Sequence, residues 1–211
     1  TTNCDTSSSS TFGVDINGDG TKDFVFAEMF GGSGAYVGYR IFELPKEDVI
    51  KELVRFDDIS GGATFKDLNN DGKIDVEFRD SIFNGWKTGY ASSPSGMIIL
   101  SWNKAMQTYI PDLDLMRKPP PSQAEMTEQV NFYKNTDWCV KVGETGISCS
   151  MPWSYAVDLI YSGNATSAKK YLEAVWPLVS EKLITVYNRV YDNFPTDATE
   201  KWLENEMLLQ L

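Results

Sequence analysis

The side chains best suited to chemistry are aspartates and asparagines that recur in one spacing at two places. Residues 15–23 read DINGDGTKD and residues 67–75 read DLNNDGKID; we call these segments loop 1 and loop 2. Side-chain oxygens at positions 1, 3, 5 and 9, with glycine at position 6 for a sharp turn, suit a hard cation such as calcium. The repeated pattern predicts two calcium sites. The alternative is two Asx-Gly turns that hold no metal.

Each loop offers five predicted ligands. Position 7 contributes only its backbone carbonyl, so a lysine there is compatible with a site. The predicted metal ligands are Asp15, Asn17, Asp19, Thr21 and Asp23 in loop 1, and Asp67, Asn69, Asp71, Lys73 and Asp75 in loop 2. We expect affinities of about 10⁻⁴ to 10⁻³ M, because neither loop has the bidentate glutamate that closes an EF-hand at position 12.

Each loop runs into a segment with the pattern of a strand, not of a helix. Position 12 is Phe26 in one copy and Phe78 in the other, within short alternating apolar segments. A calcium loop followed directly by a strand resembles the FG-GAP/VCBS repeat of integrin-type propellers and of many secreted bacterial proteins. The resemblance covers roughly residues 13–110 and implies structural calcium. A propeller has about four to eight blades, so two loops favour a small antiparallel β-domain of two blade-like repeats.

The two repeats share one order of elements: loop, strand, glycine-rich connector, strand, strand. The connectors are residues 31–38 and 84–96. A single repeat cannot bury its apolar face, so we expect the two copies to pack together. The pair Asp57 and Asp58, which precedes Gly61 and Gly62, is assigned to a turn.

The second half of the chain changes character after residues 118–122, KPPPS, which form a stiff polyproline segment. From Pro152 onward the apolar spacing is helical, and it involves Ala168, Leu172, Val175, Val179, Leu183, Val186 and Val190. Pro177 is expected either to split this stretch into two helices or to lie in the first turn of the second. Residues 197–200, DATE, form a capping box that opens a final helix. The helical aromatic residues, such as Tyr171 and Trp176, are interpreted as core; the alternative is that they line a peptide-binding groove.

These patterns predict an α+β fold in which a β-domain precedes a helical region. The expected boundaries are a flexible leader at residues 1–12, a β-domain with two calcium loops at 13–115, a proline-rich linker and cysteine-containing hairpin at 116–152, and a helical region at 153–211.

Three cysteines bear on the compartment. Cys139 and Cys149 flank a hairpin turn at residues 143–146, and a disulfide between them would close a loop of roughly 11 residues worth about 2.8 kcal/mol. Cys4 is left over, and it is free, paired elsewhere or lipidated. Disulfides and weak calcium sites both belong outside the cytoplasm. We therefore expect a secreted, periplasmic or cell-surface protein.

Charge and composition exclude several functions. The net charge of −11 argues against nucleic acid or an anionic membrane as a partner, and no apolar run is long enough to span a bilayer. The absence of histidine removes Ser-His-Asp triads, Cys-His pairs and imidazole bases. A carboxylate pair could still hydrolyse glycosides, but the acids outside the loops lie among charged neighbours typical of a solvated face: Glu43, Glu47, Asp48, Asp57 and Asp58. We expect no enzymatic activity.

The predicted function is a calcium-stabilised extracytoplasmic module that binds a protein or a glycan, as in adhesion. The contact would be made by the connectors, which carry Tyr36, Trp86 and Tyr90. Alternatively, these aromatic residues fold back over the core. Two other functions fit the sequence: an inhibitor or immunity-type protein of the cell envelope, and a self-associating structural subunit of a surface filament.

Overall fold

The structure, a computed structural model, describes residues 12–30, 36–44, 50–84, 93–136, 139–142, 146–149 and 152–190. The chain forms two compact units, which are described separately. Unit 1 comprises residues 1–84, 95–117 and 161–163; unit 2 comprises residues 85–94, 118–160 and 164–211.

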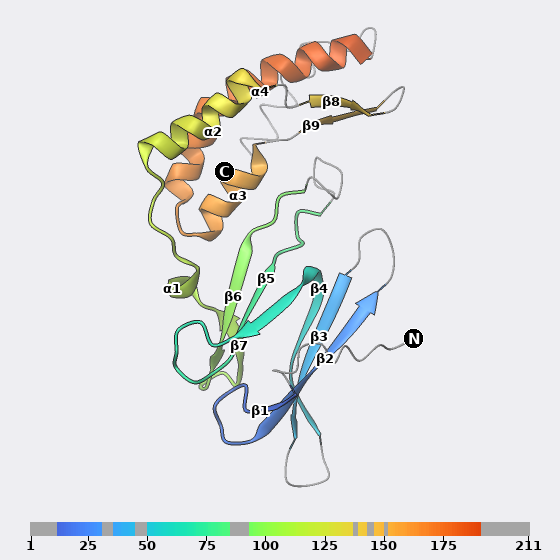
Figure 1. The fold of residues 1–211 in the computed structure, drawn as a ribbon, viewed down its shortest axis with the longest axis vertical. Coiled ribbons are helices and arrows are strands. Elements are labelled where there is room, and N and C mark those ends of the chain that lie inside the picture. The colour runs from blue at the N-terminus through green and yellow to red at the C-terminus, as the bar shows by residue number, and fades with distance from the viewer. Residues whose placement is uncertain are drawn as a thin grey trace. The chain divides into compact units, whose positions relative to one another are not determined.

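Unit 1 is built on an antiparallel sheet in which each strand pairs with the next along the chain (Figure 1). The strands are β1 (Phe12–Val14), β2 (Lys22–Phe30), β3 (Tyr36–Leu44), β4 (Lys51–Lys66), β5 (Asp75–Arg79), β6 (Met97–Asn103) and β7 (Thr108–Pro111). The short helix α1 (Leu113–Met116) follows β7. The order loop, strand, connector, strand, strand therefore occurs twice, as β2–β3–β4 and as β5–β6–β7, as the sequence predicts. The predicted bounds of the first connector, residues 31–38, are wrong at the end, because β3 already begins at Tyr36.

The long strand β4 joins the two copies. Its first part pairs with β3 up to Ser60, and its last residues pair with β5. The strand thus belongs to both four-stranded halves of the sheet. The turn predicted beside Asp57 and Asp58 is wrong, because β4 continues through these positions. The left-handed backbone of Gly61 (φ 78°) and Gly62 (φ 85°) coincides instead with a shift of register, as in a β-bulge.

The core of unit 1 draws on both copies of the repeat. Its buried hydrophobic members are Ile16, Ile41, Val76, Leu100, Trp102 and Tyr109. Phe56 of β4 meets the ring of Tyr109 of β7 edge-on, with centroids 6.0 Å apart. The first copy contributes Ile16 and Ile41 to this core and the second contributes Val76, Leu100, Trp102 and Tyr109. The two copies therefore share one core, which satisfies the need of each to bury an apolar face.

Unit 2 contains the helices α2 (Gln123–Asn135), α3 (Trp153–Tyr161, whose last residue is grouped with unit 1) and α4 (Ala165–Val190), and a hairpin of β8 (Cys139–Val142) and β9 (Gly146–Cys149). The buried residues of its core are Ala156, Leu159, Ala168, Tyr171, Leu172 and Val175. Tyr171 is fully buried and Trp176 packs against this cluster, which agrees with the interpretation of the helical aromatics as core. The α+β class, with β-structure first and helices mostly C-terminal, is confirmed.

Helix α2 lies in the segment that the sequence analysis assigns to linker and hairpin. Ser122 caps it in a complete capping box with Glu125, directly after the proline run. Its surface is mostly polar, and only Met126, Val130 and Tyr133 pack against the helical core. Such a narrow apolar stripe gives a weak helical period, which is why the pattern missed it.

Helix α4 continues through Pro177, so neither expected interruption of the helix at this residue occurs. Proline removes one hydrogen bond and crowds the preceding turn, at a cost of about 3 kcal/mol. Pro177 is exposed, whereas Ala168, Leu172 and Val175 form a buried stripe before it. The packing of that stripe holds the helix in spite of the proline.

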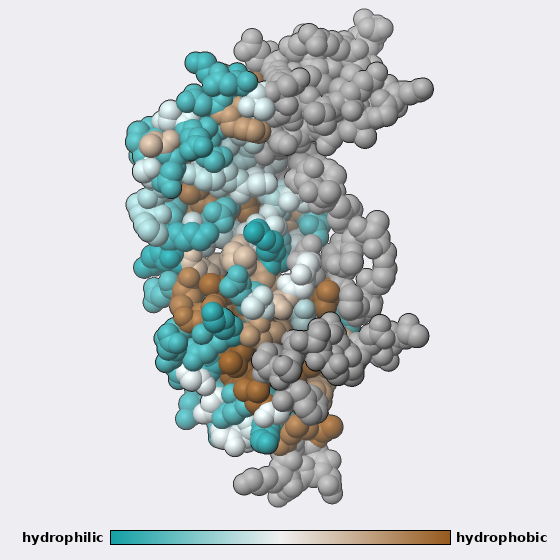
Figure 2. All heavy atoms as spheres, viewed as in Figure 1, coloured by the Kyte–Doolittle hydropathy of each residue, from teal (hydrophilic) through white to brown (hydrophobic). Residues whose placement is uncertain are grey.

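Several predicted features fall outside the described residues. They are the leader with Cys4, the connector residues Trp86 and Tyr90, the acids Glu47 and Asp48, and the helix expected after residue 197; the side chains of Tyr36, Asp57 and Asp58 are not described either. In the part that is described, no helix has the length and apolar character needed to cross a membrane. On the face in Figure 2, hydrophilic side chains separate small groups of hydrophobic ones.

Candidate metal-binding loops

Both loops occupy the same place in their repeat. Loop 1 connects β1 to β2, and loop 2 connects β4 to β5. In each case the last predicted ligand, Asp23 or Asp75, lies in the strand that follows. The strand ladder therefore fixes the end of each loop, while the turn chemistry fixes its start.

In loop 1 the predicted ligands organise the backbone. Asp15 accepts hydrogen bonds from the backbone N–H groups of Gly18 (2.8 Å), Asp19 (3.0 Å) and Gly20 (2.8 Å). The Oδ1 of Asn17 accepts from the N–H of Asp19 at 3.0 Å, and the Oδ1 of Asp19 accepts from the N–H of Thr21 at 2.7 Å. These bonds fold nine residues into a compact turn whose oxygens are held in place.

Most of these hydrogen bonds have an equivalent in loop 2. Asp67 accepts from the N–H groups of Asp71 (3.2 Å) and Gly72 (3.0 Å). The Oδ1 of Asn69 accepts from Asp71 at 2.9 Å, and the Oδ1 of Asp71 accepts from the N–H of Lys73 at 2.9 Å. The two segments are thus equivalent in geometry as well as in sequence.

The two loops also touch each other. The N–H of Ile74 in loop 2 donates to the carbonyl of Ile16 in loop 1 at 2.9 Å. The hydroxyl of Tyr109, from β7, donates to the carbonyl of Ile74 at 2.8 Å. Burial raises the pKa of Tyr109, and the charges of Asp23 and Asp75 raise it further. Both closing aspartates therefore lie close enough to one buried tyrosine to act on it.

Asp23, which closes loop 1, is a buried carboxylate with one oxygen unused. Its side chain is 0% exposed, and its Oδ2 accepts from the N–H of Ile16 at 2.8 Å. Its Oδ1 has no hydrogen-bond partner among the described residues. Burial raises the pKa of Asp23 to about 6; the backbone N–H groups of Ile16 and Asn17 lower it, and the charges of Asp19 and Asp15 raise it. A carboxylate in this state is destabilising unless a proton or a cation joins it.

Asp75, which closes loop 2, is equally buried but has a partner for each oxygen. It is 2% exposed, its Oδ2 accepts from the N–H of Leu68 at 2.9 Å, and its Oδ1 accepts from the hydroxyl of Ser101 at 2.5 Å. Ser101 comes from β6, next to β5 in the sheet. The neighbour of Asp23 across the ladder is a carboxylate instead, Glu43 of β3. Glu43 is itself paired with Lys51 at 3.7 Å. The sheet therefore supplies a hydroxyl donor at Asp75, whereas the residue opposite Asp23 is an acceptor that cannot donate to it.

The fifth position differs between the loops as well. In loop 2 the ammonium group of Lys73 donates to the Oδ2 of Asp71 at 2.7 Å, and this bond lowers the pKa of Asp71 and raises that of Lys73. In loop 1 the Oδ2 of Asp19 accepts from the side-chain amide of Asn17 at 3.2 Å. One loop thus contains an ion pair where the other has a neutral donor.

The donor sets fit a hard cation by their chemistry, and loop 1 fits it better. Three carboxylates and one amide per loop are oxygen ligands of the kind calcium takes, and Thr21 and Lys73 add backbone carbonyls at position 7. The unused oxygen of Asp23 is the observation that speaks for a missing positive charge. Within the described ranges, no three Cys, Asp or Glu side chains already converge as a metal-binding group.

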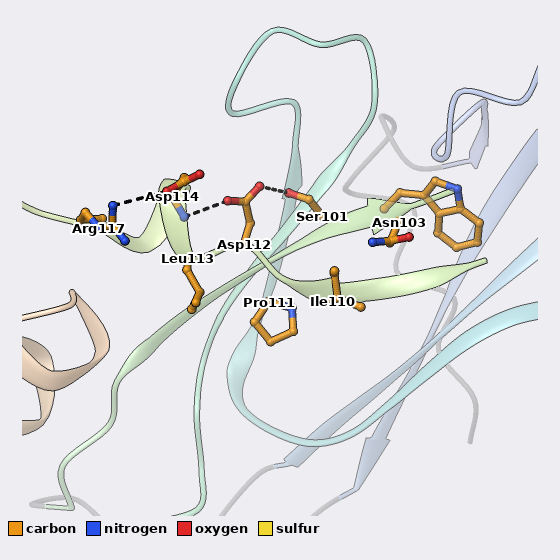
Figure 3. Close-up of a pocket in the computed structure, with 9 residues that line it drawn as sticks. Ser101, Asn103, Ile110, Pro111, Asp112, Leu113, Asp114 and Arg117 are labelled. Atoms are coloured by element: carbon orange, nitrogen blue, oxygen red, sulfur yellow. Dashed lines mark hydrogen bonds and ion pairs between the residues drawn. The ribbon is translucent and has the colours of Figure 1, made fainter. Parts of the chain in front are cut away.

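A shallow depression of about 490 Å³ lies beside loop 2, where β6, β7 and α1 meet (Figure 3). Asp112, on its lining, caps α1 by accepting from the N–H groups of Asp114 and Leu115, and its other oxygen lies 3.0 Å from the hydroxyl of Ser101. Arg117 is paired with Asp114 at 3.5 Å. The charged groups that line the depression therefore pair with one another or with the backbone. The described lining shows no set of polar groups aimed at a ligand.

Sequence reasoning missed Ser101 and Tyr109, which hold loop 2 from distant strands. Ser101 follows a run of apolar residues, and neither Ser101 nor Tyr109 has a motif around it. The available signal was their place in the strands that come after β5 in the chain: Ser101 lies in β6, which pairs with β5, and Tyr109 lies in β7, which pairs with β6. No protein-family model, curated protein or solved structure matches this chain.

Proposed function

We propose that the protein is an extracytoplasmic calcium-binding module. It binds two calcium ions, one in each loop, and each ion stabilises the start of one β-repeat. The observation that carries the proposal is the buried carboxylate of Asp23, whose Oδ1 has no hydrogen-bond partner among the residues that the structure describes. The loop around it already orients Asp15, Asn17 and Asp19. A calcium ion would neutralise these charges and supply the missing contact. Its role is structural, since the ligands are built into the turn that starts a strand.

The hairpin β8–β9 supports the proposed compartment. Cys139 and Cys149 are directly opposite each other in the ladder. Opposed residues of an antiparallel pair have Cα atoms about 4.5 to 5.5 Å apart, which lies within the range of a disulfide. We infer that these cysteines are bonded and that the protein works in an oxidising compartment. Mass spectrometry of a non-reduced digest should find the two cysteines in one cross-linked peptide.

The binding partner is proposed to be a protein or a glycan, as expected from the aromatic connectors. The connector positions follow β2 and β5, the strands that each calcium loop precedes, so calcium would fix the base of the elements that carry them. Glycan-array binding in calcium, lost in a Trp86→Ala and Tyr90→Ala double variant that still folds, would support this assignment. Unchanged binding by the double variant would show that Trp86 and Tyr90 do not make the contact with the partner.

The calcium assignment is tested by calorimetric titration of chelator-treated protein, with thermal melts alongside. We expect two ions per chain. At a tenfold excess of calcium over Kd, each site should add about 1.4 kcal/mol to the free energy of unfolding. That gain corresponds to a rise in Tm of about 3 to 6 °C per site for a chain of this size. An unchanged melt and no heat at millimolar calcium would contradict the proposal, and magnesium at equal concentration is the control for nonspecific ionic effects.

A further inference from the structure

Lys73 is the one basic residue that the structure places inside the ligand set of a loop. Its ammonium group is 2.7 Å from the Oδ2 of Asp71, a predicted ligand at position 5. Both side chains are partly exposed, 35% for Lys73 and 39% for Asp71, so the ion pair can open without exposing a buried charge. An ammonium at that oxygen occupies a place that a metal ion would need.

The path of the Lys73 side chain explains how it reaches this position. A Cβ placed on Gly18 of loop 1 would lie 3.1 Å from the Cγ of Lys73. The aliphatic part of Lys73 therefore runs along Gly18, where the absence of a side chain leaves room for it. Gly18 has a left-handed backbone, φ 74°, at the fourth position of loop 1. The neighbouring loop thus supports the lysine that serves loop 2.

Among the described residues, no ammonium group pairs with Asp19 as Lys73 pairs with Asp71. The pKa of Asp19 is nevertheless lowered, against the effect of burial, by hydrogen bonds and by the charge of Lys51 on β4. The seventh position of loop 1 is Thr21, and its own lysine, Lys22, follows at position 8 with an exposed side chain. The Oδ2 of Asp19 accepts from the amide of Asn17 at 3.2 Å, a neutral donor, and the Oδ1 of Asp23 has no partner in the described part of the chain. Loop 1 therefore has more ligand capacity left for a cation than loop 2.

We propose that Lys73 is an internal cation that competes with calcium for loop 2, so that calcium fills loop 1 before loop 2. This inference rests on the proposed function and adds an order of filling to it. Calcium entering loop 2 must displace the ammonium from Asp71, whereas calcium entering loop 1 meets unused oxygen. The affinity of a calcium loop depends on the charge of its ligands, and Lys73 reduces that charge only in loop 2.

The test is a calcium titration followed by NMR, with the amide signals of Gly20 and Gly72 as reporters. Each of these glycines donates its N–H to the first aspartate of its own loop, at 2.8 Å and 3.0 Å, so each signal reports one site. In the wild-type protein we expect Gly20 to respond at lower calcium than Gly72. The variant Lys73→Met keeps an unbranched apolar side chain, one atom shorter than lysine, and removes the charge. It should raise the affinity of loop 2 by about twofold to fivefold, the value of an exposed ion pair.

Lys22→Met is the matched control, since it removes one positive charge at the adjacent position of loop 1. It should leave the affinity of loop 2 unchanged within about twofold, because Lys22 lies outside the ligand set of that loop. Equal filling of the two loops in the wild type, or an unchanged ratio of affinities in Lys73→Met, would overturn the inference and leave the proposed function standing. Absence of calcium binding at both loops, in the wild type and the variants, would overturn both.

Discussion

Loop 1 and loop 2 share a motif and most of a hydrogen-bond network, but they neutralise their carboxylates in different ways. Loop 2 uses groups from the protein: the ammonium of Lys73 at Asp71 and the hydroxyl of Ser101 at Asp75. Loop 1 leaves one oxygen of the buried Asp23 without a partner among the described residues. The comparison teaches that one motif can pair both oxygens of its closing aspartate in one copy and leave one oxygen unpaired among the described residues in the other.

The comparison also separates burial from satisfaction of polar groups. Asp23 and Asp75 are 0% and 2% exposed, so exposure alone does not distinguish them. The difference lies in the strand next to each closing aspartate, which offers Glu43 in one case and Ser101 in the other. A buried charge is costly unless it is paired. We therefore expect the two copies to respond differently to the same substitution.

Equivalent substitutions should differ most in their effect on the free energy of unfolding at position 2 of the loops, where Ile16 corresponds to Leu68. Ile16 is fully buried in the core of unit 1, whereas Leu68 is only partly buried. Ile16→Ala should lower the free energy of unfolding by about 2 to 5 kcal/mol through the cavity it leaves. Leu68→Ala should cost about 1 kcal/mol. Urea unfolding in chelator measures both, and equal losses would show that the two loops anchor to the core equally.

The next largest difference should appear at the closing aspartates. Replacing them by asparagine should change the free energy of unfolding in opposite directions in the two loops. In chelator, Asp23→Asn should leave the protein as stable as the wild type or more stable, by up to about 2 kcal/mol, because it removes an unpaired buried charge. Asp75→Asn should destabilise it by about 1 to 2 kcal/mol, because the bond from Ser101 is weakened. Chemical unfolding at one pH and one ionic strength compares them.

Calcium provides the control for this pair. Each variant should lose the stabilisation that calcium gives to its own loop and keep that of the other loop. If Asp23→Asn destabilises the metal-free protein as much as Asp75→Asn does, the unused oxygen of Asp23 has a partner in solution. The proposed difference between the loops, an unpaired oxygen on Asp23 but not on Asp75, would then be wrong.

The smallest difference should appear at position 4, where loop 1 has Gly18 and loop 2 has Asn70. Both adopt a left-handed backbone, with φ of 74° and 61°. Gly18→Ala should cost about 1 kcal/mol, because alanine is strained at this φ and its Cβ would crowd the Cγ of Lys73. Asn70→Gly should change stability by only a few tenths of a kcal/mol, since asparagine tolerates this conformation. Calorimetric melts in chelator would detect both, and a neutral Gly18→Ala would contradict the crowded contact.

The local geometry of the loops could be predicted from the sequence because its causes are local. The bonds from Asp15 to the N–H groups of Gly18 and Gly20, and those from Asp67 to Asp71 and Gly72, span five residues or fewer. Short polar side chains and glycines at fixed spacing define such turns on their own. The capping box at Ser122 also depends on residues close in sequence. The helix that it starts was not predicted, because it lacks a broad apolar stripe.

The sequence by itself therefore determined the two loops, the strands that follow them, the β-then-helix order and the residues that could hold calcium. Only the tertiary structure decided which closing carboxylate is satisfied. Ser101 reaches Asp75 across 26 residues, Tyr109 reaches Ile74 across 35, and Ile74 meets Ile16 through packing of the two copies. Strand register and the shared core select these partners, and such long-range contacts leave no fixed spacing in the sequence.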